Sequence, residues 1–405
     1  MSKLAINGGE KVFDKEADII GWPPKYDDTE KLLCEIYRSA KWSFNGKYER
    51  LFDEKFAAYQ KAKYGVFMVN GTVTLESALA VFNIGPGDEV IVPAYTWIAT
   101  GMAPLYLGAT PVIVDIEPDT LCMSPEAFEA AITPRTKAVI PVHLYGSMAD
   151  MDKICAIAKK NNIRVIEDCA HAHGTMWKDK AAGSIGDIGS FSFQESKTMP
   201  CGEGGICLTN DEKIFERLDR LAHIGYPREV KQGCKAEPPP MDLLCRNYRA
   251  TDFQAAILLG HLKRLEEQTL LRDKNAKYIT KRLKSVPGIS VQKPGKNVTV
   301  QGFYVFALLL HFEELKEGTT RAEIIKALNA EGLAIGTGWG AGEPVFEQNL
   351  WNIPSDKYRV EDIRVTREYC GKRMITTSLT WLMLSEEDTS LICDAIEKVM
   401  AAYRK

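Results

Sequence analysis

Residues 165–205 contain the side chains with the clearest capacity for chemistry. Asp168 follows a short apolar run at residues 163–166, which predicts a carboxylate at the carboxyl end of a buried strand, where open parallel sheets bind ligands. Ser192 lies in a segment that alternates small and aromatic residues like a strand, and Lys197 follows it in a loop rich in glycine. An acid, a serine and a lysine in one strand-loop-strand passage could hold a cofactor and transfer protons.

A zinc site is an alternative use of the same passage. His171 and His173 share one face of an extended segment, and together with His143 and Asp168 they could bind the metal of a hydrolase. Such spacing often arises by chance, and no HExxH pair is present in the sequence. We therefore expect no metal.

A possible phosphate site begins where an apolar run at residues 66–69 meets a predicted helix. Gly71 and Thr72 stand at the start of that helix, where unpaired backbone N–H groups and the helix dipole favour an anion. Glycine lets the anion approach the backbone closely. An N-cap by Thr72 is an equally good interpretation of this turn taken alone.

Several short motifs follow one another along the chain up to about residue 285. They are Asn70-Gly71-Thr72, Pro93-Ala94-Tyr95-Thr96-Trp97, Glu167-Asp168-Cys169-Ala170-His171, Ser192-Phe193 with Lys197, Gly202-Glu203-Gly204-Gly205 and Asn247-Tyr248-Arg249. Their types and order resemble those of the DegT/DnrJ/EryC1/StrS family of pyridoxal-phosphate-dependent sugar aminotransferases. The resemblance implies the fold of type I pyridoxal-phosphate enzymes, which is similar to that of aspartate aminotransferase.

The resemblance also implies a role for each matching residue. Lys197 would be the catalytic lysine that forms a Schiff base with pyridoxal phosphate, and Asp168 would keep the pyridine nitrogen protonated. The other implied cofactor contacts are Gly71, Thr72, Val73 and Ser192 at the phosphate, Trp97 against the ring, His171 near the phenolic oxygen, and Asn247 reaching the phosphate of a neighbouring subunit. The implied substrate contacts are His143 and Arg249.

The implied activity is a ping-pong transamination. An amino group would pass from glutamate or glutamine to a keto sugar or a cyclitol ketone, in a homodimer with shared active sites. Residues 4–9 and 192–205 resemble most the branch that aminates cyclitols of the scyllo-inosose type with glutamine. Residues 336–340 and 376–381 match no branch, so a nucleotide-linked keto sugar is the alternative acceptor.

Three other functions compete with transamination. Sugar dehydratases of the same family replace the lysine with histidine, and this chain has Lys197. A nicotinamide-dependent oxidoreductase could use Glu167-Asp168 to hold a ribose, but no glycine fingerprint opens a helix about twenty residues earlier. A regulator or scaffold without activity would be expected to lose Lys197 or Asp168, and neither is lost.

The strands that would carry these groups alternate with segments that are long enough for helices. Apolar runs occur at residues 66–69, 89–92, 111–114, 138–142 and 164–166. This alternation predicts an α/β protein with a mostly parallel sheet that helices cover on both faces. We predict a large domain over residues 1–250 that includes an N-terminal arm, and a smaller α+β domain over residues 251–405.

The composition narrows the range of partners. The 405 residues carry a formal net charge of −3 with both signs interspersed, which predicts neither nucleic acid nor an anionic membrane as a partner. No run approaches the ~18 apolar residues of a membrane span, and the amino-terminal residues lack the apolar core of a signal peptide. The 10 cysteines show no paired spacing and are expected to be reduced. We expect a cytoplasmic enzyme with small-molecule substrates.

Overall fold

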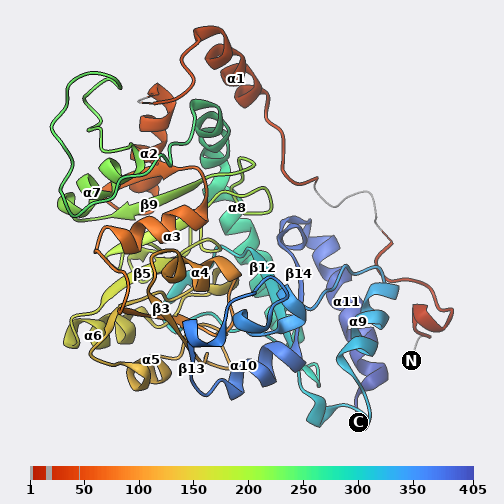
Figure 1. Ribbon diagram of the computed structural model, residues 1–405. Helices are drawn as coiled ribbons and strands as arrows, with labels where there is room; N and C mark the ends of the chain where they lie inside the picture. The colour runs from red at the N-terminus through yellow and green to blue at the C-terminus, as the bar shows by residue number, and fades with distance from the viewer. Residues whose placement is uncertain (1–2, 15–20, 45) are drawn as a thin grey trace.

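The computed structural model describes residues 3–14, 21–44 and 46–405 (Figure 1). Its main element is an 8-stranded sheet with the order β1-β9-β8-β5-β4-β2-β3-β13. The pairs from β8 to β13 are parallel, whereas β9 is antiparallel to both β1 and β8. The predicted mostly parallel sheet is confirmed. The strands are β1 (Tyr64–Met68), β2 (Glu89–Pro93), β3 (Thr110–Val114), β4 (Thr136–Val139), β5 (Arg164–Asp168), β8 (Ile188–Ser192), β9 (Gly205–Thr209) and β13 (Arg359–Val360).

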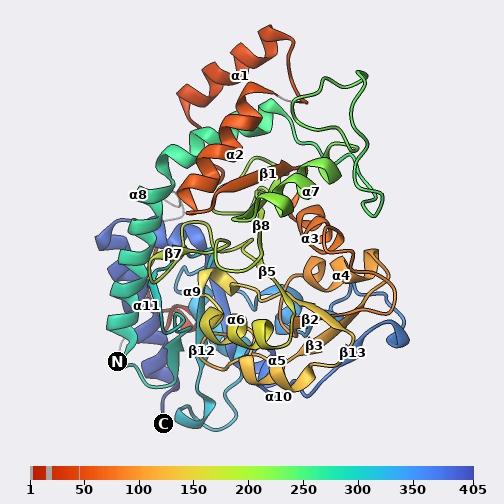
Figure 2. The same ribbon diagram turned by 90° about the vertical axis from the view of Figure 1, so that its left-hand side faces the viewer.

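Side chains that alternate along these strands build a hydrophobic core on each face of the sheet. Val90 and Val92 belong to the core that contains α3, α4 and α7, whereas Ile91 between them belongs to the core that contains α2, α5 and α6. Successive side chains of a strand point to opposite faces, so both faces need helices over them. Figure 2 shows α3 and α4 on one side of β5 and β8 and α8 on the other. The helices are α2 (Lys47–Tyr59), α3 (Gly71–Ala80), α4 (Ile98–Tyr106), α5 (Pro125–Ala131), α6 (Met151–Lys160), α7 (Glu212–Ala222) and α8 (Asp252–Leu283).

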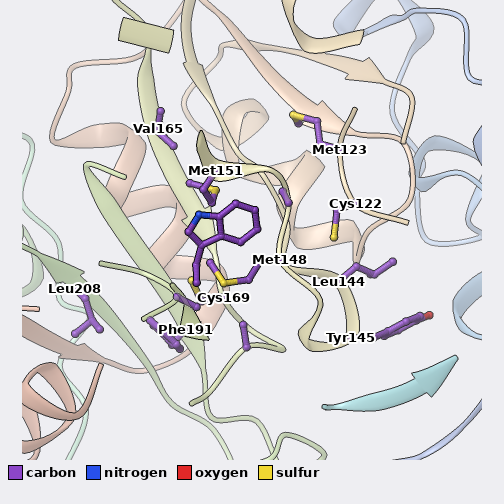
Figure 3. Packing of buried hydrophobic residues seen from close by; sticks show 14 of the residues in the cluster. Cys122, Met123, Leu144, Tyr145, Met148, Met151, Val165, Cys169, Phe191 and Leu208 are labelled. Carbon is purple, nitrogen blue, oxygen red and sulfur yellow. The ribbon is translucent and has the colours of Figure 1, made fainter. Parts of the chain in front are cut away.

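The core on the α6 side of the sheet holds the end of β5 in place. Figure 3 shows part of this core, to which Met148, Met151, Val165 of β5 and Cys169 contribute. Cys169 is fully buried and directly follows Asp168. The packing therefore anchors the strand end that carries the predicted acid.

Helix α8 joins the large sheet to another core. Ala255 and Leu258 near its start pack with the large sheet, whereas Ala276 and Ile279 pack in a core around an antiparallel sheet of order β10-β12-β14. The predicted division between residues 250 and 251 stays a prediction, because this helix contributes to both cores. The elements of the second core are β10 (Ile289–Val291), β12 (Val305–Leu310), α9 (Arg321–Ala330), β14 (Met374–Ser378) and α11 (Glu386–Tyr403).

The amino-terminal residues lie beside α9 (Figure 1), where the Ala5 N–H donates to the Glu331 carboxylate at 2.8 Å. Residues 1–2 and 15–20 of the predicted arm, and residue 45, lie outside the described residues. Within the described ranges, no helix is long and apolar enough to cross a membrane. Apart from short 3-10 and π turns, the other elements are α1 (Asp27–Ser39), α10 (Arg364–Glu368) and a small sheet of order β11-β6-β7, formed by β6 (Met176–Trp177), β7 (Lys180–Ala181) and β11 (Val298–Val300).

Candidate active site

A cavity of about 680 Å³ lies at the carboxyl ends of β1, β2, β5 and β8. It brings together most of the predicted site residues, namely Gly71, Thr72, Trp97, Asp168, His171, Ser192 and Lys197. The other predicted residues, which do not line it, are Val73, His143, Asn247 and Arg249. The rest of the lining consists of Asn70, Leu75, Thr96, Ala99, Thr100, Val142, Ala170, Gln194, Ser196, Glu203, Tyr304 and Trp339.

Lys197 is held in the cavity by the backbone of its loop. Its N–H donates to the Gln194 carbonyl at 2.8 Å, and its own carbonyl accepts a 3.1 Å hydrogen bond from the indole of Trp22. Burial lowers the pKa of Lys197 to about 8, although the Asp168 carboxylate acts in the opposite direction. A substantial fraction of the amine is therefore neutral near physiological pH, which is the form that acts as a nucleophile or base.

Asp168 is a buried carboxylate with defined orientation at the end of β5. The Thr100 hydroxyl donates to Oδ2 at 2.8 Å, and the Ala170 N–H donates to Oδ1 at 3.2 Å. Burial raises the pKa of Asp168, and these two hydrogen bonds lower it in part. Each carboxylate oxygen can accept more than one hydrogen bond. Asp168 can therefore still accept a hydrogen bond from an N–H or O–H group bound in the cavity.

The hydrogen bonds of His171 indicate its tautomer. The Tyr145 N–H donates to Nδ1 at 3.4 Å, so Nδ1 is the acceptor nitrogen, while the buried Nε2 has no partner. Burial lowers the pKa of His171 far below its ordinary value, which keeps the ring neutral. A neutral ring that accepts at Nδ1 carries its hydrogen on Nε2, so His171 offers one free N–H donor in a residue that lines the cavity.

The start of α3 and the end of β8 approach closely on another side of the cavity. A Cβ at Gly71 would lie 2.6 Å from the Ser192 Cβ, so only glycine fits. Asn70 is the N-cap and accepts from the N–H groups of Thr72 and Val73. The N–H of Val73, a predicted cofactor contact, is therefore bonded to Asn70. The hydroxyls of Thr72 and Ser192 remain as donors at the helix start.

His143 forms a buried hydrogen bond with Glu167 away from this cavity. Its Nε2 lies 2.9 Å from Glu167 Oε2, and both side chains are inaccessible to solvent. Burial alone would raise the pKa of Glu167, but hydrogen bonds from His143 and from backbone N–H groups hold it below its usual value. The predicted substrate contact of His143 is corrected: Glu167 and Asp168 point to opposite faces of β5, and His143 pairs with Glu167.

The zinc alternative finds no matching geometry. In the described part of the chain, the one group of three potential ligand residues close enough for a metal is His143, Glu167 and Cys169. Glu167 already accepts hydrogen bonds from three backbone N–H groups and pairs with His143. The cluster is therefore a satisfied structural network, and His171 and His173 lie outside it.

Comparison with known proteins decides the family. The sequence profile of the DegT/DnrJ/EryC1/StrS aminotransferase family matches residues 25–397. The chain belongs to this family. The predicted enzyme class, an aminotransferase that depends on pyridoxal phosphate, and the predicted cofactor are therefore confirmed, and a nicotinamide-dependent oxidoreductase is excluded.

Individual relatives match over nearly the whole chain. The L-glutamine:2-deoxy-scyllo-inosose aminotransferase of Micromonospora echinospora is 34% identical, over 100% of this chain and 99% of the relative. GDP-perosamine synthase of Caulobacter vibrioides is 35% identical, over 93% of this chain and 97% of the relative. The X-ray structure of an aminotransferase from Psychrobacter cryohalolentis superposes with a TM-score of 0.85 at 30% identity, over 94% and 98% of the two chains. The predicted fold class is confirmed.

Two residues of the family motif, Asn247 and Arg249, lie outside the cavity. Asn247 is exposed, and its backbone forms a bridge to His223. The Arg249 guanidinium lies 5.1 Å from the ring centroid of Phe44, and its buried Nη1 has no hydrogen-bond partner. Neither side chain lines the cavity that contains Lys197.

The sequence motifs missed the aromatic wall of the aminotransferase cavity. Tyr304 lies 4.3 Å from His171 between ring centroids, and Trp339 lies 5.0 Å from the same histidine and 5.9 Å from Trp97. Trp339 comes from residues 336–340, the glycine-rich segment that matched no branch. The signal in the sequence is a tryptophan between glycines, which is typical of a tight loop. The structure gives the reason for one of these glycines: a Cβ at Gly338 (φ +77°) would lie 2.5 Å from the Tyr95 hydroxyl.

Proposed function

We propose that this aminotransferase moves an amino group from glutamine or glutamate to a cyclitol ketone of the scyllo-inosose type. The main support for a cyclitol acceptor is the charge of the side chains that line the cavity. Lys197 is the one cationic side chain among the described lining residues, and Asp168 and Glu203 are carboxylates. A nucleotide-linked sugar brings a diphosphate that proteins bind with arginine, lysine or helix ends. A neutral polyol suits this lining better, and 34% identity to a scyllo-inosose aminotransferase agrees.

The cavity residues fit pyridoxal phosphate. Asp168 would hold the proton at the pyridine nitrogen, and the free Nε2–H of His171 would donate to the phenolic oxygen. The phosphate would lie at the start of α3, against the hydroxyls of Thr72 and Ser192, where the Gly71 backbone comes close. Trp97, a residue that is 44% exposed, would cover the ring.

Proton transfer is the task of Lys197. When bound, the cofactor supplies an electron-withdrawing ring that stabilises negative charge at the α-carbon of the donor. The neutral Nζ of Lys197 would take the proton from that carbon. In the second half-reaction, Lys197 would deliver a proton to the former carbonyl carbon of the acceptor, which becomes the carbon that bears the new amine. The low pKa of the amine suits both directions, because catalysts of proton transfer work best with a pKa near the working pH.

We also propose that the enzyme is a homodimer whose subunits complete each other's sites. Asn247 and Arg249 lie outside their own cavity, and Arg249 Nη1 lacks a partner. Across a subunit interface, Asn247 would reach the cofactor phosphate. Arg249 would supply a second cation, for the carboxylate of the amino donor, because Lys197 is the one cation among the described lining residues of a single subunit.

A nucleotide-linked keto sugar is the alternative acceptor. Its support is the 35% identity to GDP-perosamine synthase over 93% of the chain. If this alternative holds, the diphosphate would have to bind to side chains from a second subunit.

A direct comparison of acceptors tests the proposal. The purified enzyme, loaded with pyridoxal phosphate, is incubated with glutamine and either 2-deoxy-scyllo-inosose or a GDP-linked keto sugar, and the amine product is measured by mass spectrometry. We expect amination of the cyclitol and none with Lys197→Ala. Amination of the GDP-linked sugar alone would refute the cyclitol assignment and leave the transaminase intact.

A further inference from the structure

Tyr304 reaches the cavity from the carboxyl-terminal part of the chain, one residue before β12. Its N–H donates to the Tyr145 carbonyl at 3.3 Å. The neighbouring Gly302 N–H donates to the Thr175 hydroxyl at 2.9 Å, and a Cβ on Gly302 would lie only 2.2 Å from the His173 carbonyl oxygen. The backbone that carries Tyr304 is therefore packed tightly against the segment that follows β5.

The hydroxyl of Tyr304 is tied to the loop of the catalytic lysine. Its oxygen lies 2.9 Å from the Ser196 hydroxyl, which itself donates to Gln194 Oε1 at 2.7 Å. A serine hydroxyl has a single hydrogen, so Tyr304 must be the donor to Ser196. The ring is therefore held at two ends: its backbone is bonded to Tyr145, and its hydroxyl is bonded to Ser196, the residue before Lys197.

The face of the Tyr304 ring contacts two groups of the site. Lys197 Nζ lies 4.4 Å from the ring centroid, within the range of a cation–π interaction. The imidazole of His171 stacks on the ring with centroids 4.3 Å apart and planes 14° from parallel. No motif that identified the family includes Tyr304.

We propose that Tyr304 is a positioning residue whose ring holds the ammonium of Lys197 whenever the lysine is not bonded to the cofactor. The lysine must return to the reacting carbon in each half-reaction, and a long side chain loses several rotatable bonds when it is held in one place. The ring gives the free cation a fixed position and the stacked His171 a fixed plane. This inference rests on membership of the aminotransferase family, and it is independent of the acceptor.

The ring is one of several groups that act on Lys197. Asp168 on β5 favours its charged form, whereas burial disfavours it. The imidazoles of His171 and His173 stay neutral because burial lowers both pKa values, that of His173 to about 3. Glu203 lines the same cavity. Loss of the ring alone would remove attraction for the ammonium and lower the pKa of Lys197, with the other groups unchanged.

The pKa of the free lysine can be measured without catalysis. The full-length protein without cofactor is treated with a trace of acetic anhydride at a series of pH values, and acetylation of the Lys197 peptide is measured by mass spectrometry. Tyr304→Leu removes the ring, Tyr304→Phe keeps the ring and loses the hydroxyl, and Ser196→Ala removes the hydroxyl's partner. Circular dichroism and thermal unfolding establish that each variant folds.

We expect the midpoint for Lys197 to fall by roughly 0.4 to 1.5 pH units in Tyr304→Leu. In Tyr304→Phe and Ser196→Ala it should stay close to that of the unmodified protein. With cofactor and glutamine, the pH at which the donor half-reaction accelerates should shift by the same amount in Tyr304→Leu. An unchanged midpoint in folded Tyr304→Leu overturns the proposal, and so does an equal fall in Tyr304→Phe, which would assign the effect to the hydroxyl.

Discussion

Gly71→Ala should disturb the join between α3 and β8, where the cofactor phosphate is proposed to bind. The added Cβ would lie 2.6 Å from the Ser192 Cβ and 3.1 Å from the Ser192 Cα. Carbon atoms in good contact lie about 3.5–4.0 Å apart, so one element must move by roughly 1 Å. Both atoms belong to or adjoin the backbone, which leaves no flexible side chain to yield. We expect the free energy of unfolding to fall by about 1–3 kcal/mol, as in overpacked cores.

The matched control is Gly85→Ala. A Cβ at Gly85 meets only the Leu107 carbonyl oxygen at 3.6 Å, an ordinary contact, so this variant should change stability by less than about 1 kcal/mol. Urea unfolding of the cofactor-free protein gives both values, and fluorescence titration with pyridoxal phosphate should show weaker binding for Gly71→Ala alone. Adding Ser192→Gly should restore much of the stability lost, because it removes the nearest atom. Equal stabilities for the two alanine variants, or no recovery in the double variant, would refute the steric explanation.

Further predictions concern the buried pair, the acid and the dimer. Glu167→Gln should lower the free energy of unfolding by about 1–3 kcal/mol, measured by urea denaturation, because the buried carboxylate accepts hydrogen bonds from His143 and three backbone N–H groups and an amide can accept only part of them. Since the pKa of Glu167 is lowered in the folded state, the stability it contributes is present at neutral pH and is lost as the pH falls below about 4.5. Asp168→Asn should leave cofactor binding measurable and reduce the rate of the donor half-reaction by at least about 100-fold, seen by stopped-flow absorbance. Mixed Lys197→Ala and Asn247→Ala subunits should recover activity that neither variant has alone, and no recovery would contradict shared sites.

Much of the fold and the polar half of the site could be predicted from the sequence. Asp168 stands at the end of an apolar run, and such runs in an alternating order lead to a parallel sheet. Strand ends of a parallel sheet meet at one edge, so Asp168, Ser192 and Trp97 were expected together, and they line one cavity. The roles of these residues stay predictions until the variants are made.

His143 shows where such reasoning fails. It also follows a strand, but successive side chains point to opposite faces, and the neighbouring Val142 is the residue that lines the cavity. Glu167 lies on the face opposite Asp168 and captures His143 in a fully buried pair. The position of His143 after a strand therefore predicted at which edge of the sheet it lies, but not which face of the sheet its side chain covers.

By itself, the sequence determined which groups stand at the strand ends, because the alternation of apolar runs and turns is a local property of the chain. Only the tertiary structure showed which aromatic residues line the cavity and which charged side chains it contains. Tyr304 and Trp339 reach Lys197 and His171 through the packing of the carboxyl-terminal core on the large sheet, as the contact of Tyr304 with Tyr145 shows. Contacts between segments so distant along the chain depend on how whole elements pack, and no local pattern of residues encodes them.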